Sequence, residues 1–114
     1  MTIDQDLVTR VRNAVTEQAL KSGVEPSEKQ MFGGLVIMLN GKMACGVVND
    51  ELMVRIGPKA YDEALTHAHV RPMDFTGKPM RGYVFVGALG CGNQTSVSRW
   101  IKRAIINIQS LIES

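Results

Sequence analysis

Two apolar runs separated by Asn40-Gly41 constrain the fold of this chain more than any other feature of its sequence. A two-residue type I′ hairpin turn needs positive φ at both central residues, and Asn-Gly is the pair that adopts it most readily. We therefore expect residues 35–39 and 42–48 to pair as antiparallel strands. A second turn at Asn49-Asp50 leads into a third strand over 52–56, whose side chains follow the period-two pattern of a half-buried strand.

Three helices and two further strands are predicted around this meander, from apolar periodicity and from capping and stop signals. The helices are expected over residues 4–22, with Asp4 or Asp6 as the cap and Gly23 as the stop, over 58–68 after Gly57-Pro58, and from a cap at Thr95 or Ser96 to residue 112. Residues 23–29 are expected to form a polar loop, and two short strands flank a Thr76-Gly77 turn, the second being Tyr83–Val86. The element order α-β-β-β-α-β-β-α predicts a single α+β domain over residues 1–114, with two layers, an antiparallel five-stranded sheet and helices mainly on one face.

Helices on one face would leave the other face of the sheet apolar in places. Homo-oligomerisation through that face is therefore one hypothesis. The strand register decides which apolar residues lie there. The candidates are Val36, Met38, Met43, Cys45 and Met53.

Nothing in the sequence indicates export or membrane insertion. The first ten residues lack the basic and apolar regions of a signal peptide, and the longest apolar run, 35–39, is far too short to cross a bilayer. We expect a soluble cytoplasmic protein with no membrane partner. Two cysteines without CxxC spacing, Cys45 and Cys91, are expected to be reduced and buried.

The charge of the chain is unevenly distributed. Six basic residues and one acidic residue lie between 71 and 103, although the whole chain has a net charge of only +2. This region is a candidate contact for an acidic partner or for nucleic acid, but a solvated surface is the more common origin of such asymmetry. The last helix also lacks the polar base-reading side chains of a recognition helix. The six basic residues are Arg71, Lys78, Arg81, Arg99, Lys102 and Arg103.

A glycine-rich loop before the last helix resembles a phosphate-binding loop in outline only. The spacing from Gly87 to Gly92 fits, but Asn93 and Gln94 stand where a Walker motif needs Lys and Ser or Thr. Without the lysine no cation meets the β and γ phosphates. We therefore predict no nucleotide and no other cofactor.

No catalytic or metal-binding constellation is predicted. His67 and His69 have no third and fourth ligand in the pattern and are expected to cap the end of a helix. Cys91 lies close to a helix N-terminus, where its thiol pKa would be lowered, which leaves a redox role as a further hypothesis. The sequence otherwise predicts a protein that is not an enzyme.

The motif Met31-Phe32-Gly33-Gly34 ahead of correctly spaced hairpins resembles the N-terminal domain of the TfoX/Sxy proteins. The similarity extends from about residue 10 to residue 108. Besides that motif it rests on Asn40, Gly41, Lys42, Met43, Leu52, Arg55, Phe75, Pro79, Met80, Tyr83 and Trp100. Gly33 and Gly34 are followed by a strand, so we expect them to permit a backbone bend or close packing where the chain enters the sheet.

The resemblance implies the same α+β two-layer fold and a link to the regulation of natural competence. It implies a non-enzymatic cytoplasmic domain that acts through protein contacts in transcriptional regulation. In this family the full-length regulator works with a cyclic-AMP-responsive transcription factor, so a protein partner of that kind is expected. Full-length regulators carry a second, C-terminal domain, whereas this sequence ends at Ser114, and we expect a stand-alone N-terminal domain. A nucleic-acid accessory binder using the basic 71–103 region is the alternative.

Overall fold

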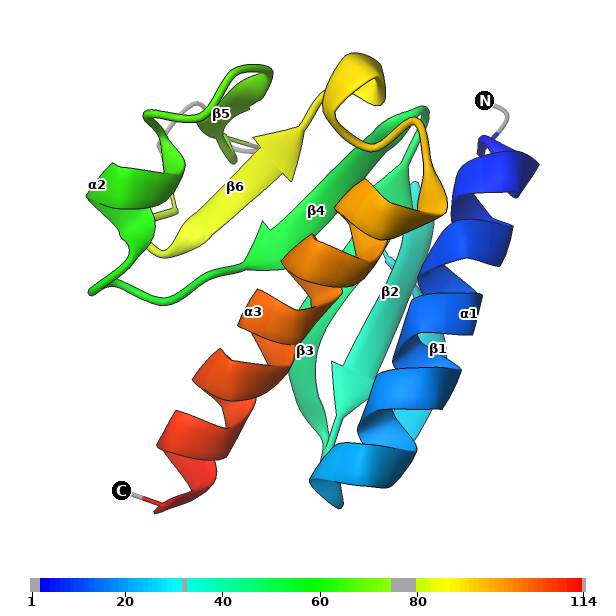
Figure 1. Ribbon diagram of the computed structural model, residues 1–114, viewed down its shortest axis with the longest axis vertical. Helices are drawn as coiled ribbons and strands as arrows, with labels where there is room; N and C mark the ends of the chain where they lie inside the picture. Colours follow the sequence, from blue (N-terminus) through cyan, green and yellow to red (C-terminus); the bar gives the residue numbers. More distant parts are fainter. Residues whose placement is uncertain (1–2, 32, 75–79, 114) are drawn as a thin grey trace.

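The fold is a six-stranded antiparallel sheet with its long helices across one face (Figure 1). The computed structural model describes residues 3–31, 33–74 and 80–113. The strand order is β1-β2-β3-β4-β6-β5. The elements are α1 (Gln5–Ser22), β1 (Pro26–Met31), β2 (Gly34–Leu39), β3 (Lys42–Val48), β4 (Glu51–Arg55), α2 (Tyr61–Ala64), β5 (Val70–Pro72), β6 (Tyr83–Val86), the 3₁₀ turn η1 (Ala88–Gly90) and α3 (Gln94–Glu113).

The predicted α+β class is confirmed, but the predicted five-stranded sheet and its element order are wrong. Residues 26–31, expected within or next to a polar loop, form the edge strand β1 and pair along their length with β2. The order is therefore α-β-β-β-β-α-β-β-α, with η1 before the last helix. All but one of the β1 residues are exposed, so the strand has no apolar alternation that would reveal it.

The hairpin predicted from Asn40-Gly41 is present. Asn40 and Gly41 both have positive φ, 52° and 79°, as a type I′ turn requires. The ladder between β2 and β3 shifts by one residue, because Ile37 pairs with Cys45 and Met38 pairs with Met43. The extra residue in β3 makes a β-bulge.

The helix ends agree in part with the expectations. The Asp4 carboxylate caps α1 by accepting hydrogen bonds from two backbone N–H groups, and Gly23 ends the helix in a left-handed conformation. The predicted caps of α3, Thr95 and Ser96, are wrong. Asn93 is the capping residue, and its Oδ1 accepts from the Ser96 N–H at 2.9 Å.

The middle helix, predicted over 58–68, is also shorter than expected. Only Tyr61–Ala64 is α-helical, and the chain turns into β5 through His69 with φ of 67°. The predicted Thr76-Gly77 turn lies outside the described residues. No helix of the described ranges is both long and apolar enough to cross a membrane.

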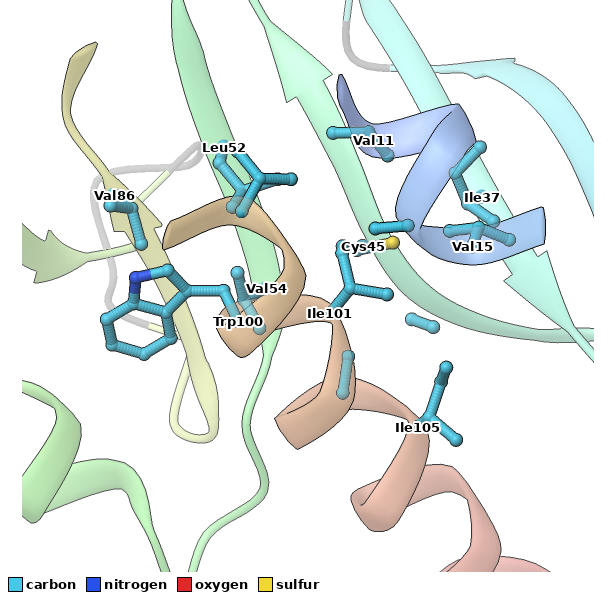
Figure 2. Close-up of a cluster of buried hydrophobic side chains, with 14 of the residues drawn as sticks. Val11, Val15, Ile37, Cys45, Leu52, Val54, Val86, Trp100, Ile101 and Ile105 are labelled. Carbon is cyan, nitrogen blue, oxygen red and sulfur yellow. The ribbon is translucent and has the colours of Figure 1, made fainter. Parts of the chain in front are cut away.

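The main core lies between the sheet and the helices (Figure 2). Trp100, Ile101 and Ile105 project from α3 toward side chains of β4 and of α1. These are buried almost completely, and large side chains of this kind each contribute about 1.5–3 kcal/mol on burial, before entropy is counted. The helices thereby cover one face of the sheet and leave the other face to different side chains.

The two glycines at the entry to β2 are needed for different reasons, one for its backbone conformation and one for close packing. Gly33 has φ of 71° and open space around the position of a side chain. At Gly34 an added Cβ would collide with the carbonyl oxygen of Val47 on the neighbouring strand. The pair thus permits both the bend and the close approach expected from the sequence.

Replacing Gly34 by alanine is expected to destabilise the fold by about 2 kcal/mol or more, because two paired backbones would have to separate. Gly33→Asn is the matched control. Asparagine tolerates the left-handed conformation and finds open space there, so a loss of no more than about 1 kcal/mol is expected. Urea denaturation of both variants measures the difference, and equal losses would contradict the steric role of Gly34.

Candidate interaction surface

The sheet face that carries no helix is apolar in its own right. Along β4 the side chains alternate, so that Leu52 and Val54 join the core under the helices while Met53 belongs to a second cluster. The same alternation on β6 places Val84 with the helices and Phe85 in the second cluster. We call this second surface the methionine face; within the described ranges no helix contributes a residue to its cluster.

The methionine face gathers six of the seven methionines in the sequence. The seventh, Met1, lies outside the described residues. The cluster consists of Met31, Met38, Met43, Met53, Met73 and Met80 together with Val36, Val48, Tyr83 and Phe85. Of the sequence candidates for this face, Val36, Met38, Met43 and Met53 lie in it, whereas Cys45 lies in the core under the helices.

The face has a buried layer under a partly exposed one. Val36, Met53 and Met73 have no exposed surface, although no described helix lies over them. The partly buried residues packed against them are Met31, Met38, Met43, Met80 and Tyr83. Methionine is unbranched and flexible, so this outer layer is an apolar surface that can adapt its shape to another molecule.

One cation of this face has no acidic partner. Arg55 Nη1 donates to the carbonyl oxygen of Met43 at 3.3 Å, and its guanidinium lies 5.4 Å from the Tyr83 ring centroid. Among the described residues no carboxylate forms an ion pair with Arg55. Arg71, by contrast, lies over the Phe85 ring and is paired with Glu51 at 2.6 Å. The face therefore carries a fixed positive group within an apolar surface.

The residues that carry the family resemblance are spread over three environments. Met31 and Tyr83 lie in the methionine face, and Arg55 packs on Tyr83. Leu52 and Trp100 belong to the core under the helices, while Gly33, Gly34 and Gly41 serve turns and close packing. Phe32 and Phe75 lie outside the described residues. Met53, a sequence candidate for this face, and Met73, which follows β5, join Met31 and Tyr83 in the same cluster.

The structure does not bring together the five described members of the predicted basic set. Arg71, Arg81 and Arg103 each form an ion pair, with Glu51, Asp62 and Glu63 respectively. Lys78 lies outside the described residues. Arg99 and Lys102 have no carboxylate partner in the described part of the chain, and they face a different side of α3 from Arg103, which lies over Trp100. Whether any of them contacts nucleic acid stays a prediction.

The cysteines are both buried and do not resemble activated thiols. Burial raises the pKa of Cys45 to about 12. Cys91 is 1 % exposed, its Sγ donates to the Gly87 carbonyl oxygen at 3.3 Å, and burial raises its pKa as well. The pKa of the Cys91 thiol is thus raised rather than lowered as expected, because desolvation by burial is the largest influence on it.

His67 is part of a small polar cluster beside α3. Its Nε2 lies 3.0 Å from a carboxylate oxygen of Glu63, and its ring meets Trp100 edge-on with centroids 5.4 Å apart. The contact with His67, followed by that with Arg103, lowers the pKa of Glu63. No three His, Cys, Asp or Glu side chains in the described ranges are grouped so that they could hold a metal ion.

A model of the TfoX N-terminal domain matches residues 18–108. The match covers all six strands of the described sheet and most of α3, but only the last turn of α1. Neither the curated proteins nor the solved structures include a match to this chain.

The buried thiols are expected to react slowly in the folded protein. Since the pKa of each thiol is raised, neither Cys45 nor Cys91 should be modified appreciably by a disulfide reagent near pH 8, and both should react at once in urea. Mass spectrometry of the modified peptides identifies which thiol reacts. Rapid reaction of Cys91 in the native protein would restore the redox hypothesis.

Proposed function

The chain belongs to the TfoX N-terminal domain family, and from that premise we propose that it is a non-enzymatic regulatory domain that acts through protein contacts in transcription. The observation that carries this proposal is the methionine face. A sheet face without helices, rich in partly exposed methionines, has the composition of surfaces that bind partner proteins. The expected location is the cytoplasm, where transcription takes place.

Methionine side chains suit such a role because they can change conformation and still make apolar contacts with a partner. A surface built from Leu or Ile would favour one complementary partner shape, whereas thioether chains can repack under different ones. Beneath them, Val36 and Met53 form a rigid buried layer that belongs to the sheet itself. The adaptable layer is therefore held on a fixed support.

Arg55 would fix the orientation of a partner bound to this apolar surface. Its guanidinium is held by the Met43 carbonyl oxygen and by the Tyr83 ring, so it loses little further freedom when a partner binds. A carboxylate of the partner next to Arg55 would make a charge-assisted hydrogen bond within an apolar contact. The expected partner surface is therefore apolar with an acidic residue.

The test compares binding of a cyclic-AMP-responsive transcription factor from the same organism to the intact chain and to its variants. Met38 and Met43 are cross-strand partners in the face, and Met38→Glu with Met43→Glu is expected to weaken binding about tenfold or more by burying charge in the contact. Biolayer interferometry with the purified factor measures this.

Leu20→Glu with Leu89→Glu is the matched control. Both leucines are more than four-fifths exposed and lie outside the cluster of the methionine face, so binding should change less than about twofold. The uncharged pair Met38→Gln with Met43→Gln keeps the test valid if glutamate unfolds the chain. Unchanged binding by the methionine variants, or no binding by the intact chain, would contradict the proposal. Light scattering that showed a dimer disrupted by the same variants would instead assign the face to self-association.

A further inference from the structure

A second surface lies between the two long helices. It carries several charges, whereas the methionine face is mainly apolar. A groove of about 660 Å³ is lined by residues of α1 and α3. Glutamine side chains tie the helices together and fix the walls of the groove. These bonds run from Gln94 Nε2 to the Arg10 carbonyl oxygen at 2.8 Å, from Gln18 Nε2 to that of Ser98 at 2.9 Å, and from Gln109 Nε2 to that of Ser22 at 3.1 Å.

The groove is lined by three cations and one carboxylate. Lys21 comes from α1, and Arg99 and Lys102 come from α3. The carboxylate, Glu17, faces Lys21 across 3.5 Å in an exposed pair. Arg99 and Lys102 have no ion pair with any described carboxylate, so two positive charges of the groove are uncompensated.

Several exposed cations, Lys29, Lys42 and Lys59 among them, also have no ion pair with a described carboxylate, but Arg99 differs from the arginines that join distant elements. Arg12, Arg71 and Arg103 all pair with glutamates at 2.6 to 2.8 Å. Arg99 has neither an ion pair nor a ring contact of the kind that holds Arg55. Its charge is available to a molecule that enters the groove.

The groove also has an apolar side. Ile105 is buried and lines it, while Ile106 is 54 % exposed beside it. A ligand that satisfies both sets of groups needs acidic residues for Arg99 and Lys102 and apolar residues for Ile106. On a helix, residues at i, i+3 and i+4 present such groups side by side.

We propose that the groove between α1 and α3 binds an acidic amphipathic helix of a partner protein. The helix lies along the groove with its apolar residues on Ile105 and Ile106 and its carboxylates next to Arg99, Lys102 and Lys21. Packing of a third helix into the groove between two others is a common mode of peptide recognition. The walls are already held by the glutamine bonds, so little ordering is needed on binding.

Two other occupants fit the groove less well. Nucleic acid gains its affinity from many phosphate contacts, and the groove offers only three cations while the other described arginines of the basic region are paired elsewhere. A second copy of this chain would have to supply α1 or α3. Each of these helices carries more basic than acidic residues, so neither is acidic.

The experiment uses a fluorescein-labelled helical peptide of leucine, alanine and glutamate and the same peptide with lysine in place of glutamate. The intact chain should bind the glutamate peptide and not the lysine peptide. Arg99→Glu with Lys102→Glu should weaken binding about tenfold or more in fluorescence anisotropy, since two charges change sign at the contact. Amide chemical-shift changes should fall on residues 17–22 and 94–109.

Lys29→Glu with Lys42→Glu is the control, because it makes the same change of charge at exposed positions outside the groove. Its affinity should stay within about twofold of the intact chain. The milder pair Arg99→Gln with Lys102→Gln keeps the proposal falsifiable if charge reversal unfolds the chain. Variants of Met38 and Met43 should leave peptide binding unchanged, so this proposal and the proposed function fail separately.

Three outcomes would overturn the proposal. The first is equal affinity of the Arg99 and Lys102 variants for the glutamate peptide. The second is binding of duplex DNA, lost in those variants, without binding of the peptide, which would assign the groove to nucleic acid. The third is self-association that depends on these two residues without peptide binding, which would assign it to a second copy.

Discussion

The sheet must bury both of its faces, and the helices cover only one; the rest of the structure follows from that constraint. On the covered face, branched and aromatic side chains pack against α1 and α3 with almost no exposure. On the other face, Val36 and Met53 have no exposed surface and belong to a cluster with the partly buried methionines. Long flexible methionines can fold over such a surface, which stiff branched side chains cannot do. The composition of the methionine face is thus a physical answer to the missing layer as well as the basis of its proposed role.

The charged side chains of the surface fall into two groups, those held in ion pairs and those without a carboxylate partner. Most arginines are engaged: Arg12 joins α1 to the edge strand through Glu28, Arg71 joins β5 to β4 through Glu51, and Arg103 joins α3 to α2 through Glu63. Exposed pairs of this kind contribute little to stability, but they decide which charges are left for other molecules. Arg55 on the methionine face and Arg99 with Lys102 in the groove are among the cations that have no carboxylate partner in the described part of the chain. The two proposed surfaces are therefore chemically distinct, and one domain could contact two partners.

The sequence predicted a feature correctly where a residue's own backbone conformation sets the requirement. Asn40-Gly41 has a local requirement for positive φ, and Gly23 ends α1 for the same reason, so both could be recognised without the fold. The edge strand β1 was missed because an exposed strand with one neighbour needs no apolar alternation. The Asn93 cap was missed because Thr95 and Ser96 are equally good capping residues, and only the start of the helix distinguishes them.

The sequence by itself determined the α+β class, the central hairpin, the apolar face of each long helix and the family resemblance, because each depends on the spacing of residues along the chain. It placed six basic residues in one region and six methionines at scattered positions. Only the tertiary structure decided that Arg71, Arg81 and Arg103 pair with acids from other elements, and that the methionines converge on one face. Ion pairs and shared faces depend on strand register and on helix rotation, and these are fixed by packing between segments far apart in the sequence.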